Sequence, residues 1–162
     1  MTEFDWPYNL PIWQASLHLD APNGEAWAKI ENAVEISMGN PTVGTLKTSS
    51  GLLIEHCNPG FIWSDDSIYI AVPQYSFSRI WGYGKQRLLV IDVKENTKWQ
   101  SPKLAYYIQP ESFEHGEISI VMNPVKKPIK RNYNINTIKK TFEVLPALPN
   151  NGMQSDAAEP QR

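Results

Sequence analysis

The stretch "SIYIAVPQYSFSRIWGYGKQRLLVIDV", Ser67 to Val93, indicates the fold class. Residues 68–72 and 87–93 both have the pattern of β-strands. The second is a nearly continuous apolar run, which is typical of a central strand covered on both faces. Between them, residues 73–86 hold four aromatic residues, two glycines and two cationic residues. The stretch therefore predicts two strands of one sheet, joined by an unusually aromatic connection.

A period of two continues outward toward the N-terminus. In residues 25–38 the even positions are apolar except for Asn32, and the odd positions are mostly polar. This alternation indicates one half-buried strand or two short ones. A helix would also place Trp27, Ile30 and Val34 on one face, but the match to a period of two is longer.

Turn sequences divide the rest of the chain into short strands. Residues 21–24 ("APNG") and 48–51 ("TSSG") have turn chemistry. Further strands are predicted over 12–19, 52–57, 104–109 and 117–122. The segment 123–136 contains two prolines, which argue against a central strand there. Residues 137–145 fit either a last strand or a short helix.

These elements predict one domain of the all-β class. A chain of 162 residues fits a single domain. About nine or ten short strands with closely spaced turns predict an antiparallel β-meander that forms an open sheet stack or sandwich over residues 1–145. Residues 146–162 have almost no apolar anchor, so we expect a flexible, disordered tail.

Residues 57–98 resemble one blade of a WD40-like β-propeller of the TolB-associated kind. The matching positions run from an aromatic–Ser–x–Asp turn to a strand that ends in Asp and a hydrophobic residue: Phe61, Trp63, Ser64, Asp65, Asp66, Tyr69, Ala71, Val90, Ile91, Asp92 and Val93. The turn reads Asp65-Asp66-Ser67, where the family usually has Pro-Asp-Gly. A closed propeller needs about four to eight blades, and this chain has room for about three. The resemblance therefore implies an incomplete, open arrangement and a binding scaffold, not a reaction.

The composition limits the class of protein. Apolar residues make up 41% of the chain and include six tryptophans, enough for a packed core. No apolar run approaches the ~20 residues of a membrane helix. The N-terminal residues lack the basic start and apolar run of a secretory signal, and the single Cys57 cannot form an internal disulfide. We therefore expect a cytoplasmic protein without membrane association.

Two short runs of neighbouring polar residues could carry chemistry, but each run has a simpler interpretation. Glu55, His56 and Cys57 place an acid, an imidazole and a thiol side by side. Neighbours on a strand point to opposite faces, so His56 and Cys57 should not meet, and Cys57 is expected to be a small buried residue. Asp65 and Asp66 are expected to form a tight turn. Neither group predicts a catalytic site.

The histidines do not predict a metal site either, because all three lie in separate segments without metal-ligand spacing. No phosphate-binding glycine-rich loop is present in the sequence, and we expect no cofactor. His115 lies beside Glu114 and Glu117. A small hydrolase-like enzyme or enzyme subunit with a pocket near His115 therefore stays an alternative.

Charge is unevenly distributed along the chain. Residues 1–78 hold nine acids and two bases, and residues 79–162 hold eight acids and thirteen bases. The two halves either mix within the sheet or give the molecule opposite charge on two sides. The bases of segment 126–140 include four candidate anion-binding residues: Lys126, Lys127, Lys130 and Arg131.

These four bases suit nucleic acid as an alternative partner. An edge strand, whose lysines and prolines oppose pairing between sheets, explains them better. The segment also lacks the repeated aromatic residues on which nucleic-acid bases stack.

The aromatic connection 73–86 has three interpretations: a plug that completes the core, a partner-binding patch, or a small-molecule pocket. The residue types of the patch are those enriched at interface hot spots: Tyr75, Phe77, Arg79, Trp81, Tyr83 and Lys85. The leading hypothesis is a non-catalytic protein-binding domain whose partner is another protein. Its specific form is an immunity-type inhibitor that neutralises a cognate toxin. The sequence leaves the oligomeric state open.

Overall fold

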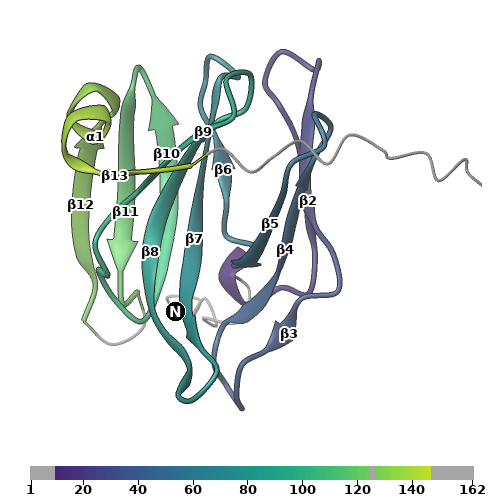
Figure 1. Ribbon diagram of the computed structural model, residues 1–162, viewed down its shortest axis with the longest axis vertical. Helices are drawn as coiled ribbons and strands as arrows, with labels where there is room; N and C mark the ends of the chain where they lie inside the picture. The colour runs from purple at the N-terminus through teal and green to yellow at the C-terminus, as the bar shows by residue number, and fades with distance from the viewer. Residues whose placement is uncertain (1–9, 125–126, 147–162) are drawn as a thin grey trace, which may run out of the picture.

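The computed structural model describes residues 10–124 and 127–146 (Figure 1). Residues 10–78 form a 3-10 helix and seven strands: η2 (Pro11–Trp13), β1 (Leu17–Asp20), β2 (Trp27–Ile30), β3 (Val34–Glu35), β4 (Thr42–Thr48), β5 (Leu53–Cys57), β6 (Ile62–Trp63) and β7 (Tyr69–Ser78). Residues 79–124 and 127–146 form six strands and one short helix: β8 (Gly82–Asp92), β9 (Thr97–Gln100), β10 (Ile108–Glu114), β11 (Glu117–Met122), β12 (Ile129–Asn134), α1 (Ile135–Thr141) and β13 (Glu143–Leu145).

The strands form two open antiparallel sheets. The larger sheet has the strand order β1-β2-β4-β5-β7-β8-β9-β13, with β3 paired to β4 and β6 paired to β7. The smaller sheet has the order β10-β11-β12 and lies on the opposite side of β7 and β8 from β2 and β4 (Figure 1). The predicted all-β class, with antiparallel strands, an unclosed sheet and one short C-terminal helix, is confirmed.

Strands β7 and β8 form the centre of the molecule because both of their faces are covered. One face packs with β2, β4 and β5 through alternate side chains: Ile70, Val72, Leu89 and Ile91. The other face packs with the smaller sheet through the side chains between them: Ala71, Leu88 and Val90. The run 88–91 has no exposed surface, which confirms the prediction of a central strand covered on both faces.

The aromatic segment 73–86, predicted as a connection between strands, is a β-hairpin instead. Strand β7 continues to Ser78 and β8 begins at Gly82, so only residues 79–81 form the turn. The ladder extends because aromatic side chains pair well across strands, as Phe77 and Tyr83 do here. A bulge between Tyr75 and Phe77 interrupts the regular register.

Other strand boundaries also differ from the predictions. Strand β10 begins at Ile108 and continues to Glu114, through residues predicted as a connection. Pro110 is tolerated because it lies at a bulge, where the ladder is irregular. At the N-terminus, residues 12 and 13 of the predicted strand 12–19 belong to η2, and β1 begins only at Leu17. Strand β9 was not predicted.

The C-terminal segment combines two predicted alternatives. In the range 137–145, the first residues belong to helix α1, which ends at Thr141. The last residues form strand β13, which pairs with β9. The side chain of Asn134 caps the helix by accepting a hydrogen bond from the backbone N–H of Asn136. Strand β12 is an edge strand, as its flanking prolines suggested. The predicted tail 146–162 lies outside the described residues except for Pro146.

The two halves of the chain occupy different sides of the molecule. Strands β1–β5 lie on one side of β7 and β8, and β10–β12 with α1 lie on the other (Figure 1). Within the described residues, the half before residue 79 carries seven acids and two bases, and the half from residue 79 onward carries six acids and eleven bases. The acid-rich strands β1–β5 and the base-rich segment from β10 to α1 therefore lie on different sides of the molecule, while β7, β8, β9 and β13 lie together in the larger sheet.

Candidate functional site

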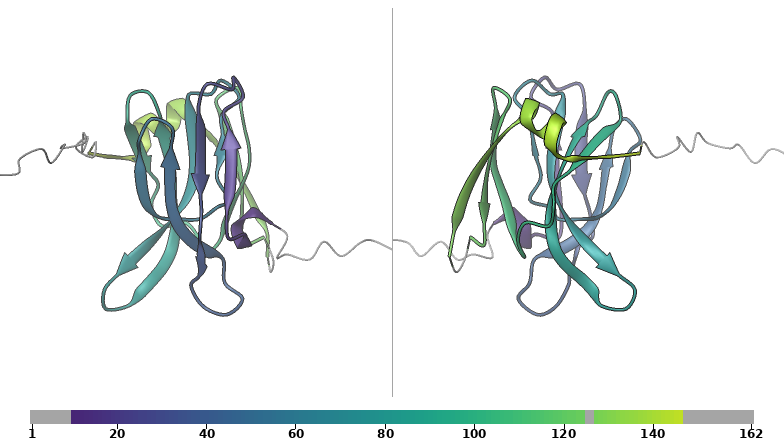
Figure 2. Two further views of the ribbon diagram at one scale, coloured as in Figure 1. Left: turned by 90° about the vertical axis from the view of Figure 1, so that its right-hand side faces the viewer. Right: turned by 60° about the vertical axis from the view of Figure 1, so that its left-hand side comes forward.

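The distal part of the β7–β8 hairpin, residues 77–83, projects from one end of the molecule (Figure 2). We call this part the hairpin tip. The β3–β4 hairpin projects from the same end and diverges from it. Gly82 has a φ of +73°, a left-handed conformation that favours glycine at the end of the turn. The hydroxyl of Ser78 closes the turn by accepting hydrogen bonds from the backbone N–H groups of Ile80 and Trp81, at 3.2 and 3.3 Å.

The hairpin tip exposes three large apolar side chains. Trp81 is 86% exposed, Ile80 is 82% exposed and Phe77 is 50% exposed. Single exposed apolar residues are common on protein surfaces, but a cluster of them on one projecting element often marks an interaction site. The proximal half of the same hairpin lies in the core, so the tip is carried by a well-anchored element.

One face of the hairpin is held by stacked rings. The imidazole of His56 stacks on Phe77 with ring centroids 4.9 Å apart and an interplanar angle of 18°. Its Nδ1 atom lies 3.1 Å from the hydroxyl of Tyr83, within hydrogen-bond distance. Tyr83 also contacts the rings of Phe77 and Tyr75, at centroid distances of 4.9 and 5.6 Å. The pKa of the Tyr83 hydroxyl is raised, mainly by burial and to a smaller extent by the nearby carboxylate of Glu55.

Two bases lie near the hairpin tip, Lys85 on β8 and Arg79 in the turn. The ammonium group of Lys85 lies 5.5 Å above the ring of Tyr106, a cation–π contact. The hydroxyl of Ser76 donates a hydrogen bond to the backbone carbonyl of Lys85 at 3.0 Å. A Cβ atom at Gly84 would lie 2.8 Å from the same Ser76 hydroxyl, so a larger residue there would have to displace this hydroxyl from its hydrogen bond. Arg79 lies in the exposed turn.

The structure separates the six predicted partner-binding residues into two groups. Trp81, Phe77, Arg79 and Lys85 are exposed at or near the tip. Tyr75 is buried at the root of the hairpin and Tyr83 is half-buried, so these two residues form the second group. Three residues of the surface were not predicted: His56, Ile80 and Tyr106. His56 precedes Tyr83 by 27 residues and reaches it only because β5 pairs with β7.

The predicted anion-binding residues are not gathered on one face. Lys130 and Arg131 are neighbours on β12, so their side chains leave opposite faces of the strand. Lys130 lies 3.9 Å from the carboxylate of Glu111, which offsets its charge. Lys127 is exposed, and Lys126 lies outside the described residues.

One further base of the segment is engaged within the molecule. The ammonium group of Lys139 donates a hydrogen bond to the hydroxyl of Tyr69 at 2.8 Å. It also lies over the rings of Tyr69 and Trp99, at 5.1 and 5.5 Å from their centroids. These contacts hold the side chain against the molecule and away from a phosphate partner.

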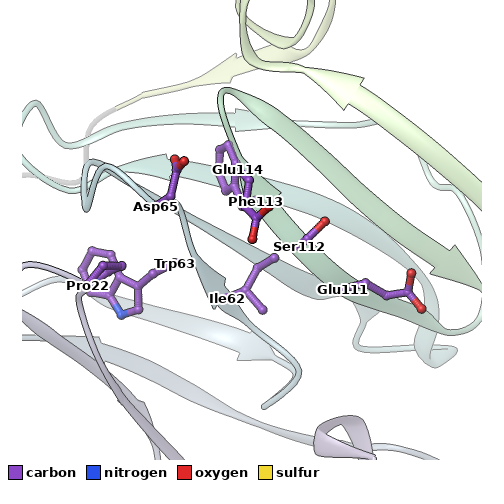
Figure 3. Close-up of a pocket in the computed structure, with 8 residues that line it drawn as sticks. All are labelled: Pro22, Ile62, Trp63, Asp65, Glu111, Ser112, Phe113 and Glu114. Atoms are coloured by element: carbon purple, nitrogen blue, oxygen red, sulfur yellow. The ribbon is translucent and has the colours of Figure 1, made fainter.

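A shallow groove of about 350 Å³ lies between the β6–β7 turn and β10 (Figure 3). Trp63 and Pro22 line one end of it, and Glu111 lies at the other. The carboxylates of Asp65 and Glu114 also border the groove, so its rim is acidic.

His115, the predicted centre of an enzyme pocket, does not line this groove. Its side chain is 90% exposed, and its backbone N–H donates to a carboxylate oxygen of Asp65 at 3.0 Å. Within the described part of the chain, no group of three His, Cys, Asp or Glu side chains could hold a metal ion. The enzyme alternative stays a prediction.

The predictions for Cys57 and Asp66 are confirmed. Cys57 has no exposed surface, and burial raises the pKa of its thiol to about 12. The imidazole of the neighbouring His56 is directed to the tyrosine and phenylalanine rings described above. Asp66 forms the tight turn: it accepts hydrogen bonds from the hydroxyl of Ser64 and from the backbone N–H of Ile68, at 2.5 and 3.1 Å.

Comparison with known proteins identifies no relative of this chain. No family model matches the sequence, and neither a curated protein nor a solved structure matches it. The resemblance of residues 57–98 to a propeller blade therefore stays a prediction. No helix in residues 10–124 and 127–146 is long and apolar enough to span a bilayer.

Proposed function

We propose that the protein is a protein-binding module of the cytoplasm and that the hairpin tip is its docking surface. The observation that carries the proposal is the exposure of Trp81, Ile80 and Phe77 on a hairpin anchored in the core. Tryptophan is among the residues most enriched at interface hot spots. A side chain presented by a rigid element also loses less conformational entropy on binding than one on a mobile loop.

The charges of the hairpin indicate the chemistry of the partner. Residues 73–91 contain three bases, Arg79, Lys85 and Arg87, and no acid. A partner that accepts Trp81 and Ile80 in an apolar pocket, with carboxylates around its rim, would complement this surface in both shape and charge. Charge complementarity of this kind mainly increases the association rate and the specificity.

In its specific form the proposal is an immunity-type inhibitor that binds and neutralises a cognate toxin. A small β-domain with one projecting, pre-organised aromatic hairpin suits this role, because it can fill a pocket of an enzyme without performing chemistry itself. A toxin encoded by a neighbouring reading frame is the first candidate partner. The proposed pair should form a tight complex, and one that forms only above micromolar concentrations would contradict this form of the proposal.

Affinity capture with matched variants tests the docking surface. The wild-type protein, Trp81→Ala and a control, Ile129→Ala, are compared on lysate of the native host. Ile129 is also a partly exposed apolar residue, but it lies on β12, away from the hairpin. We expect one stoichiometric protein that is retained by the wild type and by the control and lost with Trp81→Ala. Equal capture by all three proteins would contradict the proposal.

A further inference from the structure

The described part of the chain begins near the end of the molecule from which the two hairpins project. Leu10 leads into η2, where the indole Nε1 of Trp13 donates a hydrogen bond to the backbone carbonyl of Gly39 at 3.2 Å. The hydroxyl of Thr42 donates to the backbone carbonyl of Gln14 at 2.6 Å. Gly39 lies in the turn of the β3–β4 hairpin, which projects from the same end as the hairpin tip (Figure 2). These contacts fix the start of the described chain at that end.

Aromatic side chains connect this start with the β7–β8 hairpin. The ring of Trp13 lies 6.1 Å from the ring of Tyr107, and both residues are partly exposed. The next side chain, Tyr106, is 61% exposed, and the ammonium group of Lys85 lies over its ring. Lys85 is only two residues beyond Tyr83, where the hairpin tip ends. Exposed aromatic surface therefore leads from the start of the described chain to the tip.

The sequence that precedes this start complements the hairpin in charge. Residues 1–9, which lie outside the described residues, contain two acids, no base and three aromatic residues: Glu3, Asp5, Phe4, Trp6 and Tyr8. Residues 73–91 of the hairpin contain three bases and no acid. Opposite charges attract the two segments, and aromatic side chains suit the exposed apolar side chains of the tip.

Nine residues are also enough to reach the tip. An extended chain spans about 3.3 Å per residue, so residues 1–9 extend up to about 30 Å from Leu10. Along the hairpin, four residues separate Lys85 from Trp81, which corresponds to about 13 Å. The segment can therefore pass over Tyr106 and Lys85 and still cover Trp81.

The same chain is a better occupant of this surface than a second copy of the hairpin. Two surfaces that each carry three bases and no acid repel each other. A segment tethered at Leu10 instead has an effective concentration in the millimolar range, so even a weak contact is populated.

We infer that residues 1–9 fold back onto the hairpin tip of the same molecule, with their acids near Arg79 and Lys85 and their aromatic side chains against the exposed apolar residues. The contact would compete with a protein partner for the tip and so regulate the docking surface. This consequence rests on the proposed function, whereas the contact itself needs no partner.

Paramagnetic broadening in NMR spectra of the full chain tests the contact without a partner. A nitroxide is attached to the variant Thr2→Cys, and Cys57 does not compete for the reagent because it has no exposed surface. We expect strong broadening of the backbone amide signals of Ile80 and Trp81. The signal of Glu95, in the turn at the opposite end of β8, should stay sharp. Equal broadening at both ends, or none at the tip, would overturn the inference.

Two charge reversals and a mixing experiment show whether the broadening comes from the inferred contact. Glu3→Lys with Asp5→Lys should reduce it several-fold, whereas Asp156→Lys with Glu159→Lys, which changes the net charge equally, should not. Equal effects of the two reversals would overturn the inference. In a mixture of nitroxide-bearing and isotope-labelled chains, broadening of the tip signals would assign the contact to a second copy and would also overturn it.

Binding to the captured partner separates this inference from the proposed function. A tip that is covered for half to nine-tenths of the time binds a partner about two- to tenfold more weakly than a free tip. Glu3→Lys with Asp5→Lys should therefore bind the partner about two- to tenfold more tightly than the wild type, and Asp156→Lys with Glu159→Lys should bind like the wild type. Weaker binding by the first variant would overturn the inference. Broadening at the tip without any captured partner would contradict the proposed function alone.

Discussion

Alanine substitutions at Trp81 and Tyr83 should affect different properties, although a single glycine separates the two residues. The first should weaken partner binding, and the second should lower the stability of the fold. The indole of Trp81 is 86% exposed, so Trp81→Ala should leave the free energy of unfolding within about 0.5 kcal/mol of the wild-type value. The same substitution should weaken partner binding by about 2 kcal/mol or more, which is about 30-fold in Kd. We therefore expect this side chain to contribute to binding and not to folding.

Tyr83→Ala should instead destabilise the fold. It removes the contact of the hydroxyl with His56 at 3.1 Å and the ring contacts with Phe77 and Tyr75. A hydrogen bond contributes about 1 kcal/mol, and an aromatic pair contributes about 0.5–1.5 kcal/mol. Together these amount to about 2–4 kcal/mol, and the half-exposed position of the ring places the expected loss near 2 kcal/mol.

Urea denaturation followed by far-ultraviolet circular dichroism measures both effects without depending on tryptophan fluorescence. We expect the midpoint of Trp81→Ala to coincide with that of the wild type and the midpoint of Tyr83→Ala to be clearly lower, at similar slopes. If Trp81→Ala destabilised the protein as much as Tyr83→Ala, Trp81 would be part of the core. The reasoning from its exposure would then be refuted.

Three further predictions concern the core and the charged surface. Asn58→Ala removes three buried side-chain hydrogen bonds and should cost about 3–5 kcal/mol of stability in denaturation, whereas Asn23→Ala, at an exposed position, should cost little. Burial raises the pKa of the Cys57 thiol from 9.0 to about 12, so the folded state holds this proton more tightly than the unfolded chain does. Stability should therefore fall as the pH rises from 9 toward 12, and less steeply in Cys57→Ala; equal slopes in pH-dependent denaturation would contradict this. Reversing charge with Arg79→Glu and Lys85→Glu should slow association with the captured partner by about tenfold at low salt in stopped-flow measurements, and an unchanged rate would argue against an acidic rim.

The fold class was predictable because burial on one face of a strand leaves a period of two in the sequence. The continuous apolar run 88–91 also identified the strand covered on both faces. The hairpin was not predictable in the same way. Glycines and aromatic residues over 73–86 suggested a loop, whereas cross-strand pairs such as Phe77 and Tyr83 extend the ladder beyond the core. Local composition does not reveal such pairs until the register is known.

The candidate surface was predicted only in part, for a similar reason. Trp81, Arg79 and Lys85 lie within the segment that the sequence indicated, and the structure places them on its surface. His56 belongs to another strand, and no local pattern connects it with Tyr83. Long-range contacts of this kind depend on the three-dimensional arrangement of the sheets.

Site-specific photo-crosslinking tests the central proposal most directly. A photoreactive phenylalanine analogue is placed at position 81 and, as a control, at position 129, and each protein is irradiated in lysate of the native host. The account predicts one prominent crosslinked protein from position 81 and none from position 129. An excess of unlabelled wild-type protein should compete for this product, and an excess of Trp81→Ala should not. The same products from both positions, or competition by Trp81→Ala equal to that by the wild type, would contradict a docking surface at the hairpin tip.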